Sequence, residues 1–485
     1  MTLSIDLALE RPHVVAGEDL GFRVTLKNDG GADETVRDPA LDGEWPKVEV
    51  LEPSGYRVAY AGREDRQRGH GHDFMPPPFP ETVTLPPGGE ASSDERLLHW
   101  IGALGPGTYA VRAQLEADGH ALRSSTVPLE VAPLDARRVQ LLGTDAAPGD
   151  MTYALVTNAE PDGSLALLSW LHQLDFEGHL TAAAMQRLGP VGPGATGSVS
   201  RAGLPYPGQW VAWVEGDQLR GFYQMQGRVV APLSGVLSSP AEIIGPVLTE
   251  LEGCDGSAPP RAEVLMFAPG RAFVACIAPD GSVTEGASWS LDGTLEWGEA
   301  TLPASNVREA FVALARGGDT DAPALEVVRL RWDADQTPEP PRSIAKRPPG
   351  RVIGGDAILG PEGPHGTLVI RRMPDVTAPD LGGPVVDDYE LLLFGVDASG
   401  TPEAATLRLD VDPPRDFVQI LVALRPERGA HLLMQAVGGA WLSSDGSGAK
   451  PLTLDGDPLA LRFWGGQPRV LLATDRGPAW RPIAP

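Results

Sequence analysis

The stretch His70-Gly71-His72-Asp73 places two imidazoles and a carboxylate within four residues. Neutral nitrogen and oxygen ligands at such short spacing suit zinc or another divalent ion. Two features oppose a metal: the segment is a polar loop beside the proline-rich Met75–Pro80, and positive charge gathers around it. The nearby arginines are Arg63, Arg66 and Arg68. We therefore name His70, His72 and Asp73 as metal candidates but expect a solvated loop.

Acidic turns are the next candidates, since calcium takes oxygen ligands. Asp333–Asp335, Asp387-Asp388 and Asp455–Asp457 lack the spacing of known calcium loops, and Asp-Gly pairs are typical of hairpin tips, so we expect turns. A nucleophile elbow or a phosphate loop would need a glycine-rich turn that leads from a strand into a helix. Gly194–Ser198 and Gly354–Asp356 do not fit that context and are predicted to be plain turns. We predict no catalytic residue and no cofactor.

The chain has two cysteines, Cys254 and Cys276, which cannot form a disulfide framework or a complete zinc site alone. Cys276 lies in an apolar stretch, where a buried and inert thiol is expected.

The elements that position these residues are predicted to be strands. The chain of 485 residues contains 58 glycines and 48 prolines, which argues against long helices, while 42% hydrophobic residues are enough to build cores. The sequence therefore predicts an all-β protein with many tight turns.

Residues 1–132 are predicted to form one antiparallel β-sandwich. Leu3–Leu9 and Phe22–Leu26 alternate between apolar and polar residues, and Val48–Leu51 and Tyr56–Tyr60 flank a Pro-Ser-Gly turn as a hairpin. Short strands separated by turn signals at this spacing are what a sandwich requires.

The runs Leu85–Glu90 and Leu104–Ala113 carry a resemblance, through the motifs Leu-Pro-Pro-Gly-Gly-Glu and Pro-Gly-Thr-Tyr. They resemble the end of bacterial immunoglobulin-like modules, including the intracellular proteinase-inhibitor (BsuPI) type. The resemblance covers about a quarter of the chain. It implies that Tyr109 packs into an immunoglobulin-like sandwich, and it specifies a fold rather than an activity.

Residues 137–485 contain a repeat of about 51 residues: an apolar strand, a gap, and two strands joined by a Gly or Asp turn. Seven such leading strands begin near Thr152, Gln209, Glu263, Ala310, Thr367, Phe417 and Pro458. Repeated small meanders bury their faces against one another and close into a β-propeller. We predict seven blades, with six or eight as alternatives.

The last repeat supplies three strands, so we expect Arg138–Leu142 to add the fourth and close the ring. Ser239–Glu242 has the spacing of a helix cap, which predicts a short helix ending near Leu251. Large aromatic residues are expected to pack between the blades, with a recognition surface as the alternative. Tryptophans of the repeat region include Trp210, Trp213, Trp289, Trp297, Trp332, Trp441, Trp464 and Trp480.

The formal net charge of −26 opposes binding to nucleic acid, and we found no local basic stripe. No secretory signal and no apolar stretch of membrane-spanning length is visible. The expectation is a cytoplasmic bacterial protein that binds neither nucleic acid nor membrane.

These observations favour a non-enzymatic interaction or scaffold protein that binds a protein partner through the propeller faces and the sandwich. The first alternative is a propeller enzyme, a hydrolase or lyase, with convergent titratable groups in its central channel. The histidines of the repeat region, His172, His179, His365 and His431, are too scattered to mark such a site. The second alternative is a protease inhibitor that acts through the N-terminal domain.

Overall fold

A computed structural model describes most of the chain. The described residues are 3–37, 47–61, 82–96, 104–117, 120–142, 151–160, 162–174, 180–192, 195–199, 208–225, 228–249, 259–301, 307–316, 324–348, 350–360, 363–372, 389–397, 400–409, 417–425, 429–436, 439–444, 447–464, 467–475 and 477–483. Within these ranges the protein is all-β, as predicted, and no helix long and apolar enough to cross a membrane is found.

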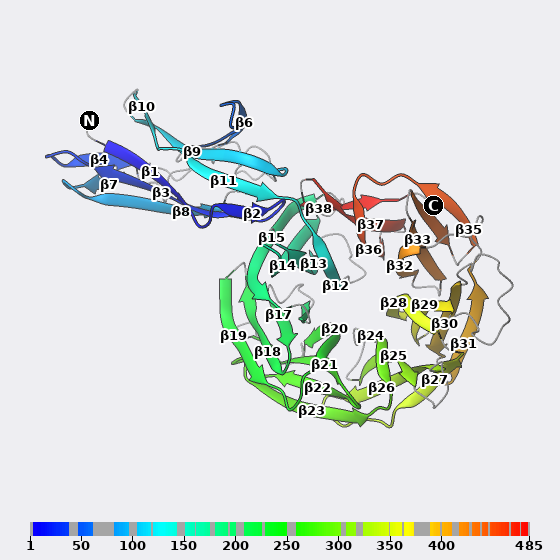
Figure 1. Cartoon of the computed structure of the whole chain (residues 1–485). Helices are drawn as coiled ribbons and strands as arrows, with labels where there is room; N and C mark the ends of the chain where they lie inside the picture. Colours follow the sequence, from blue (N-terminus) through cyan, green and yellow to red (C-terminus); the bar gives the residue numbers. More distant parts are fainter. Residues whose placement is uncertain are drawn as a thin grey trace.

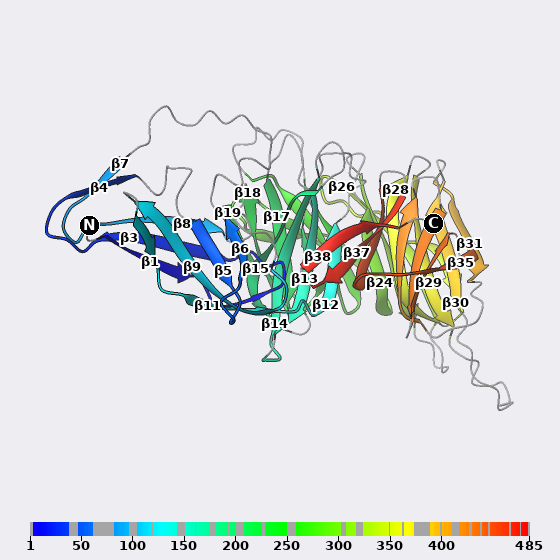
Figure 2. The ribbon, with the colours of Figure 1, turned by 90° about the horizontal axis from the view of Figure 1, so that it is seen from above.

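Two domains lie side by side, an elongated N-terminal sandwich and a ring of sheets (Figures 1 and 2). One sheet of the sandwich has the order β1-β3-β8, and a larger one has the order β2-β11-β9-β5-β6, with β10 also paired to β9 and β4 paired to β7. The strands are β1 (Leu3–Leu9), β2 (His13–Val15), β3 (Gly21–Asn28), β4 (Glu34–Arg37), β5 (Lys47–Leu51), β6 (Arg57–Ala61), β7 (Thr82–Leu85), β8 (Glu90–Arg96), β9 (Gly107–Ala117), β10 (His120–Arg123) and β11 (Val127–Ala132).

The two sheets of the sandwich share one hydrophobic core. In β1 the alternation puts Leu3, Ile5 and Leu7 inside, which is the period-2 pattern of a sheet with one wet face. Tyr109 packs against this core, and its hydroxyl donates a 2.9 Å hydrogen bond to the Gly105 carbonyl.

The ring is a β-propeller, as predicted, and its described residues form seven sheets, blades 1 to 7 in chain order. Within each sheet the strands follow one another in sequence, so each blade is a simple meander. Blade 1 contains β12 (Ala136–Leu142), β13 (Met151–Ala159), β14 (Leu165–Leu174) and β15 (Leu180–Val191); blade 2 contains β16 (Thr196–Val199), β17 (Gly208–Glu215), β18 (Gln218–Met225) and β19 (Arg228–Val236); blade 3 contains β20 (Glu242–Thr249), β21 (Ala262–Ala268), β22 (Arg271–Ile277) and β23 (Val283–Ser290); blade 4 contains β24 (Thr294–Thr301), β25 (Val307–Arg316), β26 (Ala324–Asp333) and β27 (Arg342–Arg347); blade 5 contains β28 (Gly350–Gly360), β29 (Gly363–Arg372), β30 (Tyr389–Val396) and β31 (Pro402–Arg408); blade 6 contains β32 (Phe417–Arg425), β33 (Gly429–Ala436), β34 (Gly439–Ser444) and β35 (Ser447–Leu452); blade 7 contains β36 (Asp457–Trp464), β37 (Gln467–Thr474) and β38 (Gly477–Pro482).

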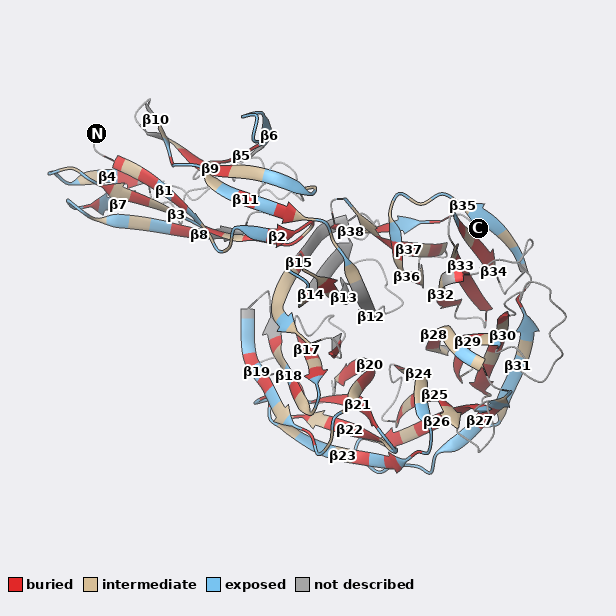
Figure 3. Cartoon of the chain, viewed as in Figure 1, coloured by how far each residue is buried: buried red, intermediate tan, exposed pale blue. Residues whose placement is uncertain are grey.

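Neighbouring blades bury apolar faces against each other, and a hydrophobic cluster fills each of the seven contacts. Figure 3 shows this burial between blades and the exposure along the outer strands. Trp289 of blade 3 and Trp332 of blade 4 meet edge to face, with ring centroids 5.7 Å apart, and Trp210 is fully buried. These three tryptophans pack between blades, as the sequence predicted.

Hairpin tips rely on Asp and Gly, as predicted. At the tip between β22 and β23, the Asp280 carboxylate accepts a backbone and a hydroxyl hydrogen bond from Ser282, at 2.9 and 2.7 Å. Gly281 has φ +82°, and a Cβ there would lie 1.7 Å from the Pro232 carbonyl oxygen of blade 2. The tip therefore requires glycine both for its backbone conformation and for its close packing.

In five of the seven blades, the strand that was predicted to come first is the second strand of its blade. The strands that begin near Thr152, Gln209, Glu263, Ala310 and Thr367 are second strands, because β12, β16, β20, β24 and β28 precede them. Their apolar runs mark the second strand, which is buried on both faces. The first strands of these blades carry weaker apolar patterns, as in the Thr-Gly-Ser-Val of β16 and the glycine-rich β28.

Where a short helix ending near Leu251 was predicted, the described residues Glu242–Thr249 form a strand, β20. Its helix-like spacing comes from a bulge: Ile244 pairs with Leu265 and Leu248 pairs with Glu263, so the intervening segment contains extra residues. Gly245 at φ +70° makes the bulge. The helix-like spacing of the apolar residues Ile243, Ile244 and Val247 therefore comes from an interrupted strand ladder and not from helical turns.

The predicted closing strand is also wrong. Arg138–Leu142 belong to β12 and pair with β13 in blade 1, and β38 pairs with β37 alone among the described strands. The backbone N–H of Ile483 donates a 3.0 Å hydrogen bond to the Pro468 carbonyl, toward β37. Because backbone nitrogens alternate in direction along a strand, the even-numbered residues of β38 point theirs away from β37. Two of these are Pro478 and Pro482, which have no N–H to give. The outer edge of blade 7 is therefore poor in donors for a fourth strand.

Candidate functional site

The first strand of each blade lies nearest the axis of the ring (Figure 1). Three of these strands bring charged side chains together: Glu299 from β24, Asp356 from β28 and Arg462 from β36. We call these three residues the axial cluster. Blades 4, 5 and 7 each contribute one member, so the cluster exists only when the ring is assembled.

Asp356 is the connecting member of the axial cluster. Its Oδ1 accepts a hydrogen bond from Arg462 Nη1 at 3.1 Å, and its Oδ2 accepts one from the backbone N–H of Leu424 on β32, also at 3.1 Å. The Asp356 side chain is 7% exposed. One buried carboxylate thus ties the inner strands of blades 5, 6 and 7, with opposite charge and hydrogen bonds to offset its desolvation.

Glu299 is the member of the axial cluster whose pKa is strongly raised. Burial raises its pKa from 4.5 to about 8, the nearby positive charge of Arg462 acts in the opposite direction, and the negative charge of Asp356 raises the pKa further. The side chain keeps some contact with solvent. At neutral pH Glu299 is therefore a protonated carboxylic acid beside an ionised carboxylate, an arrangement suited to proton transfer or to hydrogen-bonding a ligand.

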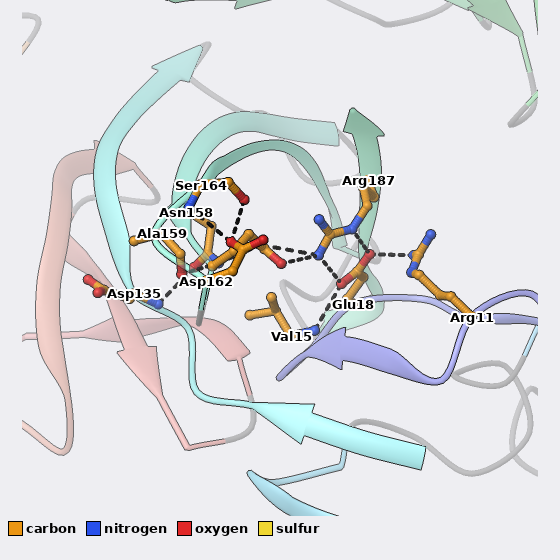
Figure 4. Close-up of polar contacts among 10 residues, drawn as sticks. Arg11, Val15, Glu18, Asp135, Asn158, Ala159, Asp162, Ser164 and Arg187 are labelled. Atoms are coloured by element: carbon orange, nitrogen blue, oxygen red, sulfur yellow. Dashed lines mark hydrogen bonds and ion pairs between the residues drawn. The ribbon is translucent and has the colours of Figure 1, made fainter. Parts of the chain in front are cut away.

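A second polar cluster joins the sandwich to blade 1 (Figure 4). The Glu18 side chain, on the loop after β2, is fully buried and accepts hydrogen bonds from Arg187 Nε and Nη2 on β15 at 2.9 and 3.1 Å. Arg11 and the backbone N–H of Val15 also donate to it. Arg187 additionally pairs with Glu160 at 3.2 Å. A buried carboxylate held by two arginines fixes the sandwich against the ring.

The metal candidates His70, His72 and Asp73 lie outside the described residues, as do Asp387 and Asp388. Within the described ranges, no group of three or more His, Cys, Asp or Glu side chains could hold a metal ion.

The other acidic candidates lie in turns or at the strand ends beside them, since Asp333 ends β26 and Asp457 begins β36. The Asp333 carboxylate accepts the backbone N–H of Thr337 at 2.8 Å and so caps a hairpin. Asp455 forms an exposed ion pair with Arg481 at 3.4 Å. Both contacts agree with the expectation of turns.

The prediction for Gly354–Asp356 was wrong, because these residues form part of β28 rather than a turn. The segment Thr196–Ser198 likewise belongs to β16. Gly355 has no room for a side chain: a Cβ there would lie 2.7 Å from the Trp297 indole nitrogen. The two glycines before Asp356 allow close packing of inner strands at the axial cluster.

His365 and His431 are each 5% exposed and bond within and between blades. The His365 ring contacts the Gly363 and Arg425 carbonyls, and the His431 ring contacts the Ser444 hydroxyl at 3.1 Å and stacks on Phe463. These two histidines serve packing, as expected. His172 and His179 lie where side chains are not described.

Cys276 is half-buried, and its pKa is raised to about 11, first by burial and then by the negative charge of Glu263. The thiol is therefore protonated at neutral pH, although Cys276 is half-buried where the prediction was a buried residue.

Sequence reasoning missed all three members of the axial cluster. They lie on three strands separated by more than 50 residues and share no motif, and each strand also carries a second charged residue. The available signal was a charged residue among the apolar or glycine residues of an inner strand, but using it requires the correct phase of the repeat.

No protein-family model matches the chain, and no curated protein is significantly similar to it in sequence. Solved structures with a similar arrangement of strands include the lectin of Aleuria aurantia, described as a six-bladed β-propeller with a novel mode of fucose recognition. It has 13% sequence identity and a TM-score of 0.40, and the match covers 66% of this chain and 97% of the lectin.

Two further similar structures are enzymes. A puromycin hydrolase has 15% identity and a TM-score of 0.41, with 73% of this chain and 51% of the hydrolase covered. The apocarotenoid oxygenase of Synechocystis has 11% identity and a TM-score of 0.35, with 93% and 96% covered. These similarities do not assign a ligand or a reaction to this chain.

Proposed function

We propose that the protein is a non-enzymatic interaction protein of the cytoplasm, which holds a protein partner against a surface composed of both the sandwich and the propeller. The junction at Glu18 carries this proposal. Because a buried carboxylate and two arginines fix the domains in one orientation, their surfaces act as one rigid unit.

The charge of the chain indicates the kind of partner. With a formal net charge of −26, the surface attracts partners with basic patches and accelerates their association at low salt. The binding should therefore weaken as salt concentration rises.

Capture from a lysate of the native host tests the proposal with three immobilised proteins: the wild type, Arg187→Ala and Arg23→Ala. Arg23 pairs with Asp94 on the exposed surface of the sandwich, so its variant is a control for loss of one arginine. We expect the wild type and Arg23→Ala to retain the same partner in stoichiometric amounts, and Arg187→Ala to retain less. Failure of the wild type to retain any protein at low salt, or equal retention by Arg187→Ala, would refute the composite surface.

A second candidate function is catalysis at the axial cluster, because Glu299 and Asp356 converge there from separate blades. The cluster offers a neutral acid and an ionised carboxylate, the pair that general acid–base hydrolysis or elimination uses. Against catalysis, Asp356 is engaged by Arg462 and by the Leu424 N–H. Only Glu299 is poised to exchange a proton.

A panel of ester, glycoside and lyase substrates separates the two candidates. Catalysis by the cluster predicts turnover that Glu299→Gln abolishes and that changes with pH around 8. Turnover that persists in Glu299→Gln would remove the cluster from the reaction.

A further inference from the structure

The contact between blades 7 and 1 differs from the other six contacts of the ring. As at the other six contacts, no described strand is shared across it, but blade 7 has three described strands where each of the other blades has four. The edge of β38 also presents Pro478 and Pro482, which cannot donate to a further strand. At this contact the first blade therefore meets a blade with three described strands and an outer edge that is poor in hydrogen-bond donors.

The sandwich enters this contact. The hydrophobic cluster at the seam contains Val15 of the sandwich together with Met185 of blade 1 and Leu471 and Trp480 of blade 7. Val15 is 1% exposed. Of the seven clusters that join blades, this is the one in which a described residue of the sandwich lies between two blades.

Backbone contacts reinforce the insertion on both sides. On blade 1, the N–H of Asp19 donates to the Met185 carbonyl at 2.7 Å, and the N–H of Met185 donates to the Gly17 carbonyl at 3.1 Å, which forms a short parallel bridge. On blade 7, Gly477 lies so close that a Cβ would be 2.8 Å from the Gly17 Cα. The segment Val15–Asp19 thus touches both ends of the ring.

We propose that Val15–Asp19, which we call the clasp, is the element that holds the propeller closed. In this arrangement blades 1 and 7 stay together because both bind the clasp, and the Glu18–Arg187 ion pair locks the clasp to blade 1. The sandwich is then a structural part of the ring. Release of the clasp frees blade 7 first, since that blade has three described strands and two ladders where each of the other blades has three ladders.

Hydrogen–deuterium exchange on the full chain tests the clasp. Glu18→Ala removes the lock from the sandwich side and Arg187→Ala removes it from the ring side. Gly477→Ala changes no charge and inserts a methyl group between the clasp and blade 7, but it also strains the backbone of β38, where Gly477 has φ +101°, so it supports the clasp only together with the other two variants. The control is Arg329→Ala, which removes a largely buried arginine paired with Glu309 inside blade 4.

We expect exchange in β36–β38 to accelerate at least tenfold in all three clasp variants, with β20–β27 unchanged. Arg329→Ala should accelerate exchange in blade 4 and leave β36–β38 at the wild-type rate. The proposal is overturned if the clasp variants leave β36–β38 protected, or if exchange rises evenly around the ring. The two variants of the Glu18–Arg187 ion pair and the methyl insertion act from different positions, so failure of one variant to fold leaves two measurements.

Discussion

Replacement of Glu299 by glutamine should change how the stability of the propeller depends on pH. In the unfolded chain Glu299 loses its proton near the ordinary value of 4.5, whereas the folded chain holds it to about pH 8. Between these values the folded state binds one more proton, so the free energy of unfolding falls by about 1.4 kcal/mol per pH unit. Over the whole interval the loss is roughly 3 to 5 kcal/mol, the lower figure allowing for partial contact with solvent.

Glu299→Gln carries no titrating proton, so its stability should not include this loss. We expect wild type and variant to unfold at similar urea concentrations at pH 5, and the variant to be more stable by about 3 to 5 kcal/mol at pH 8.5. Tryptophan fluorescence reports the transition, because nine of the eleven tryptophans lie in the propeller region. Glu296→Gln, on the same strand, controls for loss of a carboxylate from β24.

A direct measurement accompanies the unfolding curves. With glutamate labelled by carbon-13 at the side-chain carboxyl, one signal that is absent from the Glu299→Gln spectrum should titrate near pH 8. Titration of that signal near 4.5, or parallel pH profiles for wild type and Glu299→Gln, would refute the account of the axial cluster.

Asp356→Asn should cost about 3 kcal/mol because it leaves a partly buried arginine without its carboxylate, and it should lower the pKa of Glu299, read from the same carboxyl signal; an unchanged Glu299 titration would contradict this. Gly281→Ala should lower the urea midpoint far more than Gly270→Ala, since both glycines have positive φ but a Cβ at Gly270 meets nothing within 4 Å; equal losses would contradict the packing argument. The Cys276 thiol should alkylate slowly at pH 8 in the folded protein and rapidly in denaturant, as peptide mass mapping can follow; rapid alkylation of the native chain would contradict its burial.

The strength of the sequence-based prediction followed the strength of local patterns. Alternation in Leu3–Leu9 predicted a strand with one buried face, and Asp-Gly tips predicted hairpins, because each signal acts within a few residues. The helix predicted after Ser239 failed because a bulge in β20 imitates helical spacing. The closing strand failed because β38 turns two prolines outward, which becomes visible only when the pairing partner is known.

The sequence by itself determined that this protein is all-β, that its repeat region forms a propeller, and that tryptophans such as Trp332 pack between blades. These features follow from composition and from periods of two and of about 51 residues, which are properties of the chain. Tertiary structure alone decided that Glu299 meets Asp356 and that Val15–Asp19 lies at the seam of the ring. Such contacts join residues far apart in sequence, so their energies depend on how blades and domains pack, and no local spacing records that.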